Sequence, residues 1–176
     1  MIWTLQVLVS LIFFVNKLFL LSERKLGWLL GAVAATLAIL YFYLIGLPIY
    51  TVLEASLVIL MAYGFLKKET ENPRVEFVIR LVVIVAMFLL AIFAFNGLIT
   101  IIELPSALSM LWGTYLLTHN KMRRGWIFYG VAHLLAAILG YQKEQLFFAD
   151  FQVASAIVCF VGATKKSGVM TKAVTS

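Results

Sequence analysis

Residues 26–43 read LGWLLGAVAATLAILYFY, and residues 124–141 read RGWIFYGVAHLLAAILGY. The second stretch aligns with the first at a shift of 98 residues without a gap, and both carry a Gly-Trp pair near their start. Each is about long enough to cross a bilayer as a helix, which takes roughly 20 residues. We therefore predict that both stretches are membrane-spanning helices and that they belong to an internal repeat.

The composition of the whole chain is that of a polytopic membrane protein. Of its 176 residues, 64% are hydrophobic and 12% are charged. A soluble domain would carry about a quarter charged residues, whereas here the charges form short islands between apolar runs. The lipid bilayer is therefore the expected surroundings of the chain.

Seven apolar runs are separated by turn residues and charged islands. Gly, Pro or Asn stand at three of the breaks, and charged residues mark the remaining ones. The predicted helices cover residues 2–21, 27–45, 47–66, 77–96, 99–118, 125–141 and 146–164.

The repeat extends beyond the two opening stretches and determines the expected architecture. Gly64, Lys67 and Lys68 align with a second Gly-x-x-Lys-Lys sequence at the same shift. Three helices form each copy, and the additional helix at 77–96 restores the direction of the chain, so both copies are parallel. We predict an all-α membrane protein of seven transmembrane helices, in which a linker helix joins two three-helix repeats in a 3+1+3 arrangement. The expected units are residues 1–68, 69–98 and 99–166, followed by a cytoplasmic tail at 167–176.

The basic residues predict the orientation of the chain. Of the 14 Lys and Arg residues, Lys143 falls on one side of the predicted topology, and the others, including Lys17, fall on or next to the opposite side. The positive-inside rule makes the crowded side cytoplasmic, which predicts a multi-pass protein of the inner (plasma) membrane with its N-terminus outside. The net charge of +6 is then a topology signal with a lipid-headgroup contribution, and no nucleic-acid partner is expected. Trp28 and Trp126, at cytoplasmic helix ends, fit an aromatic belt.

The stretch TVLEASLVILMAYG at 51–64 places a carboxylate inside an apolar helix. A charged residue at the centre of a span costs about 2.5–3.5 kcal/mol, so such residues face a bundle interior or a watery cavity. At the 98-residue shift Glu54 aligns with Gln152, so each half offers one polar side chain roughly 9–12 Å from the outer end of its helix. We therefore predict that these two residues meet at a substrate site between the halves.

Further polar and aromatic residues are candidates for the same site. Asn16 aligns with Thr114 in the first helix of each half, and His133 lies in the second helix of the second half. Hydrogen bonds between helices, worth about 0.6 kcal/mol on average, are the alternative role for these polar residues and for Glu54. For Trp112, the aromatic candidate, packing between side chains is the alternative role. The predicted substrate-binding residues are Glu54, Gln152, His133, Trp112, Asn16, Thr114 and Tyr50.

Several kinds of chemistry find no support in the sequence. It contains no G-x-x-x-x-G-K-[ST] phosphate-binding motif. Its two histidines and one cysteine do not have the spacing of a metal or haem site, and Ser, His and acidic residues do not converge at one depth. Neither an enzyme nor a cofactor or metal is therefore expected, and Glu103, just before Pro105, is interpreted as a residue at an outer helix end.

These features resemble the PnuC family of bacterial vitamin transporters over nearly the whole chain. The family's basic loop, Trp-centred helix start and Gly-Leu turn are similar to LLSERKLGWLLGAVAATLAILYFYLIGLPIY at 20–50. In TVLEASLVILMAYGF, Leu53 and Glu54 occupy the places of the family's Leu-Gln pair, and Tyr63, Gly64 and Phe65 those of its Tyr-Gly-Trp.

The second half resembles the family in the same way. In YLLTHNKMRRGWIFY at 115–129, Trp126 and Tyr129 take the places of the family's Trp-x-x-Trp. His133 stands where the family commonly has an acidic residue. Glu54, Phe65 and Tyr129 depart from the family pattern and leave the substrate open.

The resemblance implies a sugar-transporter-like bundle that carries nicotinamide riboside by facilitated diffusion, with a cytoplasmic kinase that traps the product. An ionised Glu54 would favour a cation such as nicotinamide riboside or thiamine over a phosphorylated nucleotide. Proton-coupled transport of another small solute, with Glu54 as the proton carrier, is a second interpretation. A membrane subunit that binds a partner protein without transport is a third, and homo-oligomerisation stays open.

Overall fold

The computed structural model describes residues 2–67, 73–92 and 98–165, and this part of the chain consists of helices and short turns. The helices are α1 (Ile2–Leu21), α2 (Lys25–Leu44), α3 (Pro48–Leu66), α4 (Pro73–Ile92), α5 (Leu98–Thr118), α6 (Met122–Gln142) and α7 (Leu146–Thr164). Each corresponds to a predicted helix, and the largest difference is in α4, which begins at Pro73 because proline suits the first helical position. Residues 68–72, 93–97 and 166–176, which include Lys68 and Lys166, lie outside the described residues.

Four of the helices, α1, α2, α3 and α7, are long and apolar enough to cross a membrane by length and composition. Large apolar side chains on these helices are exposed, among them Leu8, Leu29, Ile59 and Ile157. Water would disfavour such an extended apolar surface, whereas lipid tails accommodate it. These features indicate a membrane protein.

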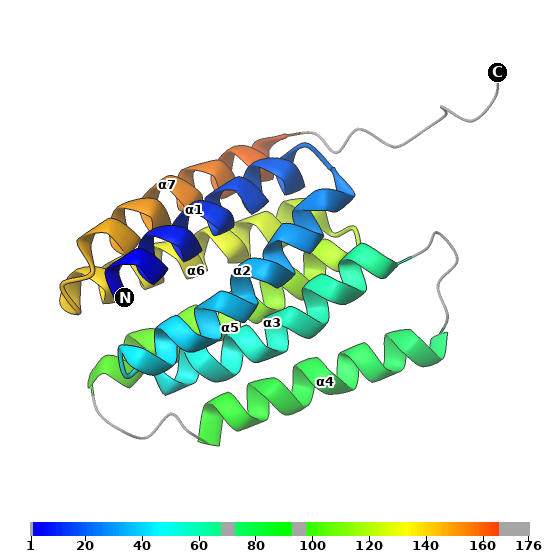
Figure 1. The fold of residues 1–176 in the computed structure, drawn as a ribbon. Helices are drawn as coiled ribbons and strands as arrows, with labels where there is room; N and C mark the ends of the chain where they lie inside the picture. The colour runs from blue at the N-terminus through cyan, green and yellow to red at the C-terminus, as the bar shows by residue number, and fades with distance from the viewer. Residues whose placement is uncertain (1, 68–72, 93–97, 166–176) are drawn as a thin grey trace.

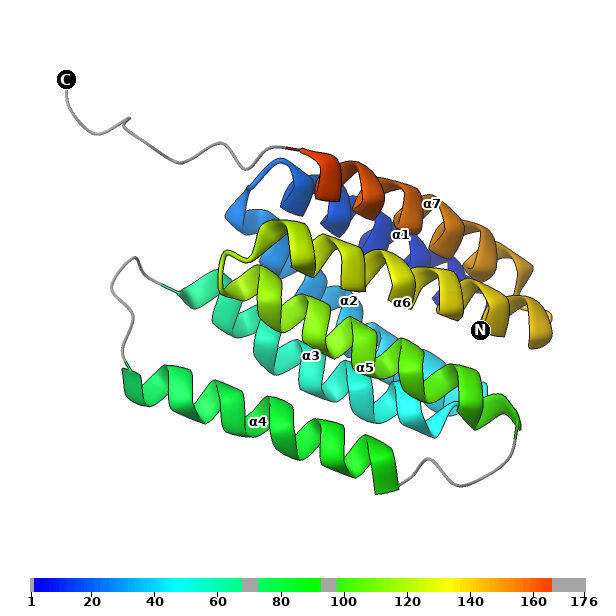
Figure 2. The same ribbon diagram turned by 180° about the vertical axis from the view of Figure 1, so that it is seen from behind.

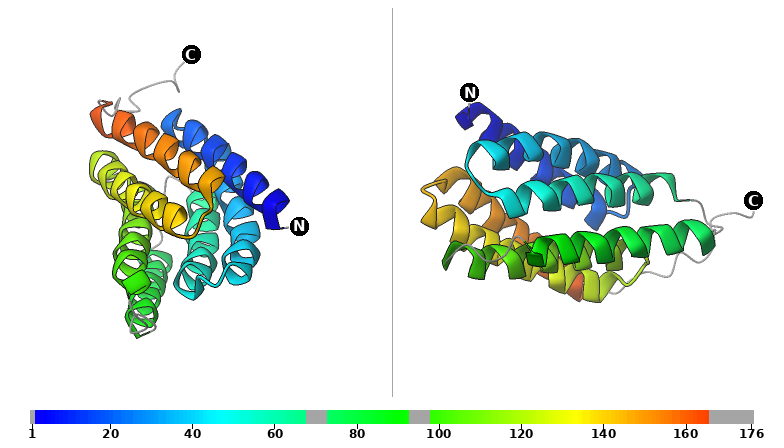
Figure 3. Two further views of the ribbon diagram at one scale, coloured as in Figure 1. Left: turned by 90° about the vertical axis from the view of Figure 1, so that its left-hand side faces the viewer. Right: turned by 90° about the horizontal axis from the view of Figure 1, so that it is seen from below.

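Six helices form a closed ring, here called the six-helix ring. Each helix contacts the next in the order α1, α2, α3, α5, α6, α7, and α7 contacts α1. Odd-numbered helices run one way along the bundle and even-numbered helices run the other way, as Figures 1 and 2 show from opposite sides. In the left panel of Figure 3, α1, α2 and α3 form one side of the ring and α5, α6 and α7 the other. Helix α4 lies outside the ring, where it contacts α3 and α5.

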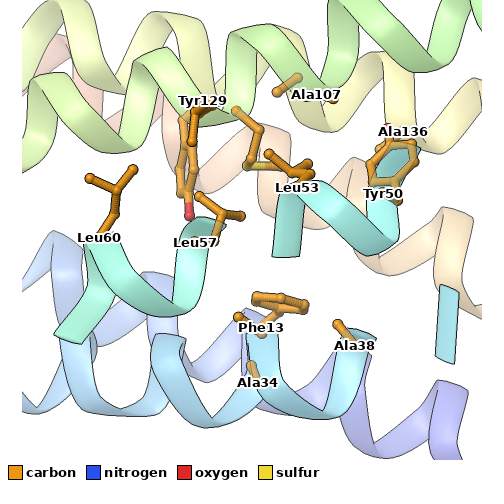
Figure 4. Packing of buried hydrophobic residues seen from close by; sticks show 14 of the residues in the cluster. Phe13, Ala34, Ala38, Tyr50, Leu53, Leu57, Leu60, Ala107, Tyr129 and Ala136 are labelled. Carbon is orange, nitrogen blue, oxygen red and sulfur yellow. The ribbon is translucent and has the colours of Figure 1, made fainter. Parts of the chain in front are cut away.

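Small side chains on α2 and α6 allow the helices of the ring to approach closely. Ala34 and Ala38 of α2 are fully buried, and Ala136 of α6 is almost fully buried. Close packing at small residues is a main source of helix association in lipid, where apolar burial gives little driving force. Figure 4 shows Tyr129 crossing the interior from α6, with its hydroxyl group toward Leu57 of α3.

The turn after α1 and the turn after α5 have the same geometry. The backbone N–H of Glu23 donates to the carbonyl oxygen of Leu20 at 2.9 Å, and that of Asn120 donates to Leu117 at 3.1 Å. Glu23 and Asn120 both have positive φ values, 55° and 56°. The matching positions 23 and 120 lie 97 residues apart.

The turns after α2 and α6 also match, but at a different spacing. The backbone N–H of Leu47 donates to the carbonyl oxygen of Phe42 at 2.9 Å, and that of Gln145 donates to the carbonyl oxygen of Gly140 at 2.8 Å. Both are Schellman motifs, the common end of a right-handed α-helix. Positions 47 and 145 lie 98 residues apart. The first half is therefore one residue shorter at the start of α2, and the gap-free shift of 98 residues applies from Gly27 onward.

This offset corrects the pairing of residues in α1 and α5. Under the 97-residue spacing the counterpart of Thr114 is Lys17, and the counterpart of Asn16 is Gly113. The hydroxyl of Thr114 donates to the carbonyl oxygen of the residue four positions earlier, at 2.8 Å, and the ammonium of Lys17 does the same at 3.1 Å. Lys17, rather than Asn16, therefore occupies the position that corresponds to Thr114.

Two lysines close the six-helix ring in the same way on its two sides. Lys67, just after α3, donates to the carbonyl oxygen of Thr118 at the end of α5 at 3.0 Å. Lys165, just after α7, donates to the carbonyl oxygen of Leu21 at the end of α1 at 2.9 Å. The last carbonyl groups of a helix have no partner within the helix, so these cations satisfy them and also favour the negative helix end.

The two tryptophans of the repeated Gly-Trp pairs pack against glycines of the following helices. A Cβ atom added to Gly64 would lie 2.5 Å from the Trp28 ring, and one added to Gly162 would lie 2.7 Å from the Trp126 ring. Trp126 is only 4% exposed. The aromatic-belt interpretation is therefore wrong for Trp126, because its ring fills the space between α6 and α7 rather than the lipid interface.

A valine in place of Gly64 tests the contact with Trp28. We expect Gly64→Val to lower the free energy of unfolding by about 2 kcal/mol, since overpacking of a close contact typically costs 1–3 kcal/mol. Thermal unfolding of the detergent-solubilised protein, followed by size-exclusion chromatography, measures the loss. Ala55→Val is the matched control because Ala55 is an exposed residue of the same helix. Equal melting temperatures for the two variants would contradict the packing described.

Candidate functional site

A pocket lies inside the six-helix ring and is called the central pocket. Side chains from all six ring helices line it: Phe13, Lys17, Phe42, Tyr50, Glu54, Leu57, Met110, Tyr129, His133, Ala136, Phe148 and Gln152. The empty space around these side chains, open solvent included, amounts to about 330 Å³, and only about one water molecule fits within it. A solute larger than water requires the two sides of the ring to separate.

Glu54 enters the central pocket from α3. Its side chain is 4% exposed, and its Oε2 atom is buried without a hydrogen-bond partner. A buried carboxylate without a full set of partners is costly, so it is retained where it has a function or a charged neighbour. Its position in the pocket agrees with the predicted location facing the interior.

Gln152 and His133 enter the pocket from α7 and α6 and are joined to each other. The Oε1 atom of Gln152 is hydrogen-bonded to Nδ1 of His133. Because an amide oxygen is an acceptor, Nδ1 carries the proton, and in the neutral ring Nε2 is left as a free acceptor. This Nε2 atom is buried and has no partner. The pair therefore presents an unused acceptor to the same interior as Glu54.

Lys17 is a residue of the pocket that the sequence does not predict at this site. Its side chain is 1% exposed, and its ammonium donates to the carbonyl oxygen of Phe13 at 3.1 Å. The ammonium lies 5.0 Å from the centre of the Phe13 ring and 5.7 Å from that of the Tyr129 ring, both within the range of cation–π interactions. The counting of basic residues assigned Lys17 to the cytoplasmic side, but the side chain lies in the interior. Its place within, rather than after, the apolar run was the signal that could have identified it.

Lys17 and Glu54 bring a basic and an acidic group into one pocket. No direct hydrogen bond or salt bridge joins them among the described contacts. When both groups are ionised, their attraction is strong in such a poorly solvated interior. The ionised pair leaves the pocket close to neutral.

Tyr50 lines the pocket, and hydrogen bonds to residues of α5 hold it in place. Its hydroxyl donates to Ser106 of α5, which donates in turn to the carbonyl oxygen of Ala132 in α6 at 2.8 Å. The backbone N–H of Tyr50 donates to Oε1 of Glu103 at 3.1 Å. The first N–H groups of a helix lack partners within the helix, so this carboxylate caps α3. Glu103 is thus a buried contact between α3 and α5 rather than a simple helix-end residue.

Three of the predicted site residues lie outside the pocket lining. Asn16 is buried and donates through Nδ2 to the carbonyl oxygen of Gly27 at 2.7 Å, so it joins α1 to α2. Thr114 is buried and bonded within its own helix. Trp112 is 38% exposed and stacks on Tyr115, with ring centres 5.2 Å apart, so it belongs to the outer surface of α5. The structure thus brings together Glu54, Gln152, His133 and Tyr50, but not the other three.

The acidic residues and histidines of the described chain do not gather into a metal site. No group of three or more His, Cys, Asp or Glu side chains in residues 2–67, 73–92 and 98–165 has the placement to hold a metal ion. Asp150, near the start of α7, accepts a hydrogen bond from the hydroxyl of Tyr141 at 2.7 Å.

Comparison with known proteins gave no match to a family model, to a curated protein or to a solved structure.

A leucine at Asn16 tests its role as a contact between helices. Asn16→Leu removes the bond to Gly27, and we expect a loss of about 1 kcal/mol of stability, within the range of hydrogen bonds between membrane helices. Thr36→Val removes an exposed bond within α2, from the Thr36 hydroxyl to the carbonyl oxygen of Ala32, and is expected to lower stability less. Thermal unfolding of the two variants measures the difference. A larger loss for Thr36→Val would contradict the assignment of Asn16 as the contact between α1 and α2.

Proposed function

We propose that the protein is a membrane carrier for a small polar solute, built as two parallel three-helix repeats with α4 as the linker. The matching turns and the two lysine caps, 97 or 98 residues apart, support a duplicated unit. The order of contacts around the ring supports the same conclusion, because it is unchanged when α1, α2 and α3 are exchanged with α5, α6 and α7. The two halves are proposed to rock about a shared axis and expose the pocket to each side of the inner membrane in turn.

The central pocket is the observation that carries this proposal. Its lining comes from both proposed halves, and it holds polar groups from four different helices, α1, α3, α6 and α7, in an otherwise apolar interior. Glu54 and Gln152, at corresponding positions of the two repeats, lie in this one pocket. Groups that served solely as contacts between neighbouring helices would not need to converge there.

Nicotinamide riboside is the leading candidate for the solute, on the strength of the resemblance to the PnuC family. Five aromatic rings line the pocket, from Phe13, Phe42, Tyr50, Tyr129 and Phe148. Aromatic faces suit a flat ring, and a cationic ring in particular. Thiamine is the alternative solute. The proposed mechanism is facilitated diffusion with trapping by a cytoplasmic kinase, which needs no energy source in the carrier itself.

Uptake into proteoliposomes tests the proposed activity. The purified protein is reconstituted with radiolabelled nicotinamide riboside outside, and thiamine and nicotinamide mononucleotide are supplied as competitors. We expect saturable uptake that stops when the internal and external concentrations are equal, with weaker competition by the phosphorylated compound. Equal rates in empty liposomes would contradict transport of this solute.

Replacing Glu54 by glutamine tests the role of the pocket carboxylate. We expect Glu54→Gln to weaken binding of the cationic solute by roughly 10- to 100-fold, the range for hydrogen bonds to charged groups, while folding is preserved. Calorimetric titration measures the affinity, and Glu144→Gln at an exposed turn is the matched control. If both variants bind as the unaltered protein does, Glu54 is a contact between helices and not a solute ligand.

Proton-coupled transport is a second candidate because the pocket holds two groups that take up protons. Oε2 of Glu54 and Nε2 of His133 are both buried without partners. A proton on either group would remove an unused acceptor, so protonation and solute binding could alternate. A pH gradient that drives uptake above the external concentration favours this mechanism, and uptake that only equilibrates favours facilitated diffusion.

A further inference from the structure

Lys17 holds an unusual position for a lysine near the end of a membrane helix. It lies four residues before Leu21, where α1 ends, and that distance is about 6 Å along the helix. A lysine so placed ordinarily extends along the apolar surface and brings its ammonium to the headgroup region. Here the side chain is directed the opposite way, toward the carbonyl oxygen of Phe13 one turn earlier.

The ammonium of Lys17 already occupies the kind of place that suits an organic cation. Two aromatic rings, those of Phe13 and Tyr129, lie within 5.0 and 5.7 Å of it. These rings come from α1 and α6, which both line the central pocket and lie on either side of α7 in the ring. Aromatic faces combined with a carboxylate are the usual recognition elements for a desolvated organic cation.

Glu54 supplies the carboxylate of this arrangement. It lines the same pocket as Lys17, and its Oε2 atom is buried without a hydrogen-bond partner. The ammonium thus compensates the carboxylate without bonding to it directly. In the closed pocket, which has little room beyond one water molecule, Lys17 accounts for the positive charge that Glu54 requires.

We propose that Lys17 is a tethered occupant of a cation site formed by Phe13, Tyr129 and Glu54, and that a cationic solute binds by displacing the lysine ammonium. This inference rests on the proposed carrier function. It deepens that function by identifying Lys17 as the group that competes with the solute for the site. The lysine neutralises Glu54 when the carrier is empty, so the empty protein can close and change orientation without an isolated charge in its interior. The solute takes over that role when it binds.

Removal of the tether should therefore tighten the binding of cations. We expect Lys17→Met to raise the affinity for a cationic ligand by about tenfold, because the ligand no longer competes with a cation that lies over the same rings. The probes are nicotinamide riboside, thiamine and 1-methylnicotinamide, a pyridinium without ribose, with uncharged nicotinamide as the reference. Calorimetric titration of the purified protein in lipid nanodiscs measures the affinities.

Matched variants separate this role from a structural one. Lys17→Arg keeps a tethered cation and is expected to bind about as the unaltered protein does, and Lys25→Met, at an exposed position, is the control for loss of a lysine. Lys17→Gln replaces the methionine variant if that protein does not elute as a folded monodisperse species. Affinity for uncharged nicotinamide is expected to stay unchanged in all of them.

The outcomes distinguish the inference from the proposed function. Tighter binding of 1-methylnicotinamide by Lys17→Met supports the tethered cation even if no nucleoside is transported, in which case the proposed carrier function alone fails. Weaker binding of the cations by Lys17→Met would show that Lys17 contacts the solute directly and would overturn the inference. Unchanged affinity, or no binding of any cation by either protein, would overturn it as well.

Discussion

The interior of the six-helix ring depends on a buried lysine and a buried glutamate that line one pocket of an apolar bundle. Lys17 and Glu54 are both almost fully buried, and each would be costly in lipid without the other. Apolar side chains gain little by leaving lipid for the protein interior, so they do not decide which helix face points inward. The buried polar residues favour the inward faces of the helices that carry them, and the close contacts at small residues set the distances between helices.

Much of the fold could be predicted from hydropathy, turn residues and the repeat. The apolar runs have the length of a membrane helix, and Gly46 or charged residues interrupt them where the turns occur. Glu54 and Gln152 are predicted to share an interior because polar groups avoid lipid and because the predicted repeat aligns the two residues. His133 and Tyr50 are predicted at the same site without such a match. Depth along a helix is readable from sequence since the rise per residue is constant.

The remaining site residues could not be predicted because they depend on the direction of each side chain around its helix. One residue of difference at the start of α2 changes the alignment of α1 with α5 by one position, which is about 100° of rotation in a helix of 3.6 residues per turn. The gap-free shift therefore aligns Asn16 with Thr114, whereas the structure gives Lys17 as the counterpart of Thr114. Trp112 has a suitable depth but points outward, and the ammonium of Lys17 points inward where its sequence position suggested the cytoplasmic side.

A structure of the solute-free protein in lipid nanodiscs, determined by electron cryo-microscopy at side-chain resolution, tests the central claim most directly. We expect density for the Lys17 side chain inside the six-helix ring, beside the rings of Phe13 and Tyr129 and in the pocket that Glu54 lines. Density that extends from Lys17 to the headgroup region, with Glu54 and Gln152 in separate helix contacts, would contradict it.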